Sequence, residues 1–155
     1  MEINGLPLHP LVVHAVVILG PLAGLTGLAY AFVPRWRWLL RWPLVALALI
    51  VATVAVVATA AGESLLDSRP ELEPLVEDHA EWGELLRTWS LAFVVDAALA
   101  AWALGGPSAL ASGRGARESK DALGWVAMVL LVAGSIGLFV LVFLAGDSGA
   151  QAVWG

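Results

Sequence analysis

Four long stretches of apolar residues alternate with short polar connections along the chain. The stretches cover residues 11–33, 39–61, 85–104 and 123–145, and each comes close to the roughly 20 residues that an α-helix needs to cross a bilayer. The alternating pattern of a β-barrel strand is absent, and a membrane otherwise leaves the helix as the way to satisfy backbone hydrogen bonds. The pattern therefore predicts an all-α protein, a four-helix transmembrane bundle that forms one domain over residues 1–155.

The composition agrees with a membrane protein and removes several kinds of chemistry. Of the 155 residues, 60% are hydrophobic and 14% are charged, which is too apolar for a soluble domain of this size. Cysteine is absent, so the chain cannot form disulfides, thiolate metal sites, cysteine-ligated iron–sulfur clusters or covalently attached c-type haem. No basic stripe is present outside short connections, which excludes nucleic acid as an expected partner.

The basic residues indicate how the helices are oriented. They gather in two of the three connections: Arg35, Arg37 and Arg41 in the first, and Arg114, Arg117 and Lys120 in the third. The second connection, residues 62–84, holds Arg69 against eight acidic residues. Lysine and arginine are enriched in cytoplasmic loops. We therefore predict an up-down topology with both termini and the acidic second connection outside.

Small residues recur on the first and fourth predicted helices. Gly20, Gly24 and Gly27 lie on the first, and Gly134, Ser135 and Gly137 lie on the fourth. Small side chains let helix backbones approach closely in a membrane. The two interpretations are tight packing inside one bundle and the seam of a homo-oligomer.

The predicted topology brings five polar side chains to the outer end of the bundle: His9, His14, His79, Glu63 and Asp147. They come from the outer ends of four different helices. Histidine with carboxylates suits a divalent metal ion such as zinc, iron, manganese or copper. His14 is one turn inside a membrane helix and needs a polar partner, so His14 and His79 form the centre of this predicted site. The same two histidines could alternatively hold a b-type haem.

One acidic residue lies within a predicted membrane helix. Asp96 is about twelve residues into the third helix, near the bilayer midplane. An intramembrane carboxylate is a functional candidate. Either it handles protons, or it is protonated and bonded to Thr26, Thr53 or Ser135 on other helices. No catalytic motif is present in the chain, so we do not expect an enzyme.

Three segments resemble a known family. They are Gly5-Leu-Pro-Leu-His9-Pro-Leu-Val-Val-His14, the acidic stretch around His79, and Gly146-Asp147-Ser-Gly-Ala150. The chain is similar over essentially its whole length to the bacterial membrane-protein family called domain of unknown function 2231. The resemblance implies a four-helix protein of the plasma (inner) membrane and points to His9, His14 and His79.

The family resemblance also bears on the cofactor. Similar segments occur fused to Rieske-type or cytochrome-type redox domains, which hints at electron transfer and a redox or respiratory partner complex. Many members have histidine where this chain has Asp147. Aspartate can replace histidine at a zinc, iron or manganese site but is a poor axial ligand of haem. If this position belongs to the site, a bare metal ion is favoured over haem.

The sequence therefore leads to one main hypothesis and two alternatives. The main hypothesis is an integral membrane protein with a metal or haem site at its outer face that supports redox or metal handling. The first alternative is a structural or accessory subunit of a larger membrane complex without a cofactor. The second is a proton path through Asp96.

Overall fold

The chain forms four long helices preceded by a two-stranded hairpin. The computed structural model describes residues 2–3, 6–104 and 122–154. The elements in chain order are β1 (Glu2–Ile3), β2 (Leu6–Pro7), α1 (Leu8–Phe32), the 3-10 turn η1 (Pro34–Trp36), α2 (Arg37–Ser68), the 3-10 turn η2 (Pro70–Leu72), α3 (Glu73–Ala103) and α4 (Ala122–Trp154). β1 pairs antiparallel with β2, and Ile3 lies opposite Leu6.

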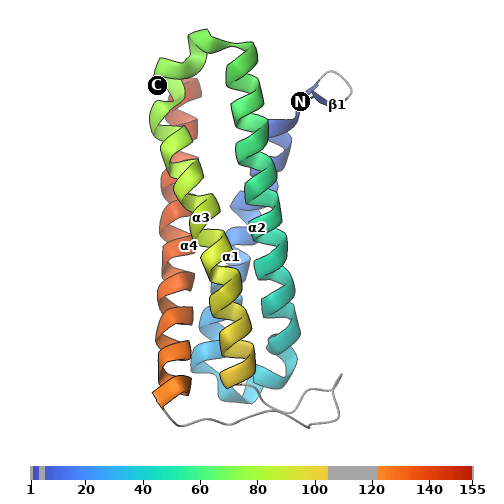
Figure 1. Cartoon of the computed structure of the whole chain (residues 1–155), viewed down its shortest axis with the longest axis vertical. Coiled ribbons are helices and arrows are strands. Elements are labelled where there is room, and N and C mark those ends of the chain that lie inside the picture. Colours follow the sequence, from blue (N-terminus) through green and yellow to red (C-terminus); the bar gives the residue numbers. More distant parts are fainter. Residues whose placement is uncertain (1, 4–5, 105–121, 155) are drawn as a thin grey trace.

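The helices lie side by side as a four-helix bundle (Figure 1). Each helix packs against two neighbours, in the order α1, α2, α3, α4 and back to α1, so that α1 and α3 are diagonally opposed. Both chain ends and η2 lie at one end of the bundle, which we call the histidine end because His9 and His79 are there. The opposite end carries η1 with Arg35, Arg37 and Arg41, and we call it the arginine end.

All four helices are long and apolar enough to cross a membrane. Each covers one of the predicted apolar stretches to within one residue. All four continue beyond it at the histidine end: α1 begins three residues before its stretch, at Leu8, and the other three extend further. α2 runs to Ser68, α3 begins at Glu73 and α4 runs to Trp154. The added residues include Ala, Leu and Glu, which favour a helix even where the sequence becomes polar. Hydropathy therefore located the membrane segments but underestimated the helix lengths.

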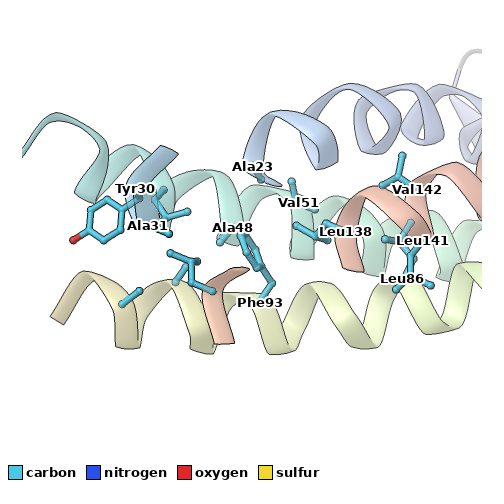
Figure 2. Close-up of a cluster of buried hydrophobic side chains, with 14 of the residues drawn as sticks. Ala23, Tyr30, Ala31, Ala48, Val51, Leu86, Phe93, Leu138, Leu141 and Val142 are labelled. Carbon is cyan, nitrogen blue, oxygen red and sulfur yellow. The ribbon is translucent and has the colours of Figure 1, made fainter. Parts of the chain in front are cut away.

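Side chains from all four helices meet in the core (Figure 2). The largest of those that are almost fully buried are Tyr30, Phe93, Leu44, Leu131 and Leu138. The glycines of α1 lie against α4, where Gly20 faces Val142 and Gly27 faces Ser135. The small residues thus serve close packing inside one bundle, the first of the two interpretations.

Large apolar side chains also cover the outside of the bundle. Ile18, Val95, Val129 and Phe143 are each at least 60% exposed. A helix that is apolar on all sides cannot hide this surface in a single bundle, and hydrocarbon is the solvent that suits it.

The first two helices and the last two helices bury residues at corresponding positions. The separation of His9 and His79 is 70 residues. The same shift carries six buried residues of α1 onto six buried residues of α3: Val16, Gly20, Ala23, Gly27, Tyr30 and Ala31 onto Leu86, Ser90, Phe93, Ala97, Ala100 and Ala101. Buried residues of α2 and α4 also correspond: Leu44, Ala48, Val51, Ala55 and Ala58 with Leu131, Ser135, Leu138, Val142 and Ala145. The hairpins α1–α2 and α3–α4 are therefore equivalent, and His9 and His79 occupy equivalent positions.

Candidate functional site

Two histidines meet in the middle of the bundle at the histidine end. His9 lies in the first turn of α1, and His79 lies in the second turn of α3, which is the diagonally opposed helix. Their Nε2 atoms are 3.4 Å apart, and their rings are nearly perpendicular, at 84° with centroids 5.7 Å apart. We call these two residues the histidine pair.

Each ring is held by a backbone carbonyl of the next helix along the chain. His9 Nδ1 is 2.8 Å from the carbonyl oxygen of Ala58 on α2, and His79 Nδ1 is 2.9 Å from that of Ala145 on α4. A carbonyl oxygen only accepts hydrogen bonds, so Nδ1 carries the proton and donates in both histidines. Ser148 Oγ also donates to the Ala145 carbonyl, at 3.1 Å.

A glycine makes room for each ring. A Cβ atom on Gly62 would lie 3.1 Å from His9 Nδ1, and a Cβ atom on Gly149 would lie 3.0 Å from His79 Nδ1. Each glycine stands one helical turn after the alanine whose carbonyl holds the ring. The spacing Ala-x-x-x-Gly is thus the sequence signal that accompanies the pair on α2 and α4, and hydropathy could not reveal it.

The two Nε2 atoms that face each other are both hydrogen-bond acceptors when the rings are neutral. Because both Nδ1 atoms carry protons, both Nε2 atoms of the neutral rings present lone pairs. Two lone pairs that face each other repel unless a cation lies between them. A cation between the two Nε2 atoms, either a proton or a metal ion, would remove this repulsion.

A cavity of about 50 Å³ adjoins the histidine pair. All four helices line it, mostly with apolar side chains that include Val13, Val16, Leu86 and Val142. One water molecule needs about 10–15 Å³ of such space. The cavity can therefore hold small ligands next to the two rings, such as water.

His14 does not join the pair. Its Nδ1 lies 2.6 Å from the carbonyl oxygen of Pro10 in its own helix, and the side chain is exposed. Five residues at about 100° each separate His14 from His9, so the two side chains leave α1 about 140° apart. The hydrogen bond to Pro10 supplies the polar partner that a histidine at this depth requires.

The two predicted carboxylates also lie apart from the pair. Glu63 is 63% exposed and forms an ion pair of 3.8 Å with Arg87. Asp147 is exposed and accepts a hydrogen bond of 2.8 Å from Gln151. Within residues 6–104 and 122–154, no three His, Asp or Glu side chains come together as a metal cluster. The structure thus joins two of the five predicted site residues and leaves three outside.

Asp96 lies far from the histidine pair on the same helix. It is half-buried, and its Oδ2 atom is 2.8 Å from where a Cβ atom of Gly134 would be. The three hydroxyls considered as its partners each donate to a carbonyl four residues earlier in their own helices: Thr26 to Leu22, Thr53 to Leu49 and Ser135 to Leu131. A proton-handling role for Asp96 stays a prediction.

The fold and the site define a class: a membrane-spanning four-helix bundle with two opposed histidines near one end. The chain belongs to the family described as "Predicted membrane protein (DUF2231)", whose model matches residues 5–155. The resemblance noted in the sequence is thereby confirmed. Neither the curated proteins nor the solved structures contain a match to this chain.

Proposed function

We propose that this membrane protein binds one transition metal ion between His9 and His79 and takes part in metal handling at the outer membrane surface. The observation that carries the proposal is the distance of 3.4 Å between the two Nε2 atoms, each of which presents a lone pair when its Nδ1 carries the proton. Imidazole suits zinc, copper, iron and nickel, and binding strength among these ions peaks at copper.

The separation of the two nitrogens fits a tetrahedral ion. Two Zn–N bonds of about 2.0–2.1 Å at the tetrahedral angle place their nitrogens roughly 3.3–3.4 Å apart, and the observed separation is 3.4 Å. Metal-binding histidines usually donate their other N–H to a carbonyl or carboxylate, as both rings do here with Ala58 and Ala145. Two protein ligands leave the other positions to water or a small ligand, which suits an ion that exchanges.

The same geometry favours a bare ion over haem. A cofactor pocket usually measures about 300–1,000 Å³, whereas the cavity beside the pair measures about 50 Å³. Room for a porphyrin between the two rings would require α1 to move away from α3. Asp147 no longer bears on this choice, because its side chain is bonded to Gln151.

An acidic groove at the same end supports the attraction of cations. Glu73, Glu77, Glu81 and Glu84 line a surface groove of about 250 Å³ between the end of α2 and the beginning of α3. Carboxylates gathered in a groove raise the local concentration of cations. We infer that metal ions approach the histidine pair from this side.

Metal analysis of the purified protein tests the proposal. We expect one zinc or copper ion per chain after gel filtration in a mild detergent, and its release on acidification as the imidazoles take up protons. Protein produced with haem available should show no Soret band. Failure to retain any metal would refute the proposal, and a stoichiometric Soret band would replace it with haem binding. A protein recovered only with fixed partner chains and no metal would favour the accessory-subunit alternative.

We further propose an up-down topology in the plasma membrane with the histidine end outside. The arginines gathered at the other end support this orientation. Because the chain has no cysteine, single cysteines report the topology directly. We expect Ser68→Cys, at the histidine end, to react in intact cells with a maleimide that cannot cross the membrane. Pro34→Cys, at the arginine end, should react only after lysis, and the reverse pattern would show the opposite orientation.

A further inference from the structure

The arginine end contains two buried polar groups without hydrogen-bond partners. Tyr30 is 0% exposed, and its hydroxyl has no hydrogen-bond partner in the part of the chain that the structure describes. The same holds for the buried Nε–H of Arg41. Native proteins rarely leave buried polar groups unsatisfied, so each such case calls for a water, an ion or a ligand.

Both groups are donors in a positively charged setting. The guanidinium of Arg37 lies 5.8 Å from the centre of the Tyr30 ring. Within residues 6–104 and 122–154, no carboxylate forms an ion pair with either arginine. In Figure 2 the hydroxyl of Tyr30 is at the edge of the core cluster and points away from it. The missing partner is therefore an acceptor, and an anion suits the site better than water.

Neighbouring contacts fix these groups in place. Arg37 donates from Nε and Nη2 to the carbonyl oxygens of Tyr30 and Ala31, both at 3.0 Å, and caps the end of α1. The guanidinium of Arg41 lies 5.4 Å from the centre of the Trp42 ring. Stacking and hydrogen bonding limit the motion of both side chains, so their charges are positioned before any ligand arrives.

Three tryptophans at the arginine end mark the level of the lipid headgroups. Trp36, Trp38 and Trp42 are each 46% exposed and lie in or next to η1. Tryptophan concentrates at the level of lipid headgroups. The phosphates of the inner leaflet therefore lie at about the height of Tyr30 and Arg41.

We propose that Tyr30 and Arg41 form a binding site for a phosphate group, either in the headgroup of an anionic lipid or as free phosphate. The Tyr30 O–H and the Arg41 Nε–H donate to phosphate oxygens, and the charges of Arg37 and Arg41 balance the anion. Arginine is well suited to this task because its guanidinium offers several donors to phosphate oxygens. The site is independent of the metal proposal, since it lies at the opposite end of the bundle.

Lipid titration followed by native mass spectrometry tests the site. The full chain in a phosphate-free detergent is titrated with dioleoyl-phosphatidylglycerol and, in parallel, with dioleoylglycerol, which has the same acyl chains without phosphate. Calorimetric titration with inorganic phosphate forms a third arm. We expect saturable binding of the phospholipid or of phosphate, and none of dioleoylglycerol.

Three variants locate the binding. Arg41→Gln should weaken binding by about tenfold or more, because it removes a charge-assisted hydrogen bond. Tyr30→Phe keeps the buried ring and should weaken binding by a few fold. Arg35→Gln is the control, since it removes the same charge from an exposed side chain stacked on Trp36, and it should change binding by less than about twofold.

The outcomes separate the sources of the phosphate. Binding of the phospholipid alone assigns the site to a headgroup, and binding of inorganic phosphate alone assigns it to the free ion; both support the proposal. Equal binding of dioleoylglycerol would overturn it. Equal weakening by Arg35→Gln and Arg41→Gln would also overturn it, because general surface charge would then explain the binding.

Discussion

Alanine in place of His9 or of His79 is expected to lower the affinity for zinc or copper by at least about a hundredfold. Each residue supplies one of the two nitrogens that face each other at 3.4 Å, and even the outer hydrogen-bond partners of a metal ligand are worth about 10–100-fold in affinity. Removing a ligand itself should cost more. A competition titration against a chromogenic chelator in detergent measures the change.

His14→Ala is the matched control for this experiment. His14 is the same residue type on the same helix, but it is bonded to Pro10 of α1 and is exposed. We expect its replacement to change metal affinity by less than about twofold. Retention of full affinity in His79→Ala, or an equal loss in His14→Ala, would show that the ion is bound elsewhere.

The sequence predicted the helices well because membrane insertion depends on hydropathy. Four apolar stretches of about 20 residues leave few other arrangements, and the structure has four helices that are long and apolar enough to cross a membrane. The sequence also placed small residues of the first and fourth helices in contact surfaces, where Gly20 and Gly27 now face α4. Helix ends were less predictable, since α2, α3 and α4 continue into polar residues beyond the apolar stretches.

The choice of histidines shows where sequence reasoning fails. The chain order places His9, His14 and His79 near one end of the bundle. It does not show which face of each helix points toward the bundle axis. Since His9 and His14 are about 140° apart on α1, at most one of them faces the bundle axis. Depth in the membrane favoured His14, whereas the structure places His9 opposite His79.

The acidic residues illustrate the same limit on α2 and α4. Glu63 follows Gly62 directly, and Asp147 stands two residues before Gly149, whose missing side chain makes room for the His79 ring. Neighbouring helical positions point in different directions, so closeness in sequence to the site does not bring a carboxylate into it. The groups that do hold the rings are backbone carbonyls, which every residue has, and only the Ala-x-x-x-Gly spacing accompanies them in the sequence.

Gly27→Ala is expected to destabilise the bundle by about 1–3 kcal/mol, the usual cost of overpacking a core. The new Cβ atom would clash with the Ser135 Oγ atom. Ser135 is 0% exposed, and its neighbours Phe93 and Leu131 are buried too, so the hydroxyl has no room to withdraw. Thermal or denaturant unfolding in detergent, followed by circular dichroism, measures the loss.

The substitution Ser135→Ala tests whether the clash with the Ser135 hydroxyl causes the loss of stability. Ser135 Oγ donates only to the carbonyl of Leu131 in its own helix, so Ser135→Ala alone should be nearly neutral. In the double variant, Gly27→Ala with Ser135→Ala, most of the lost stability should return, which a double-mutant cycle records as a coupling energy. Gly146→Ala is the matched glycine control, because its Cβ atom would meet nothing within 4 Å.

The outcome also separates packing from metal binding. Gly27 stands 18 residues after His9 on α1, roughly 27 Å away along the helix axis. A folded double variant should therefore bind metal with the affinity of the original protein. If Gly27→Ala is no less stable than Gly146→Ala, or if the two substitutions are simply additive, α1 and α4 do not approach each other at Gly27 and Ser135. Metal affinity that falls together with stability would instead show that the approach of α1 to α4 also positions His9 for the pair.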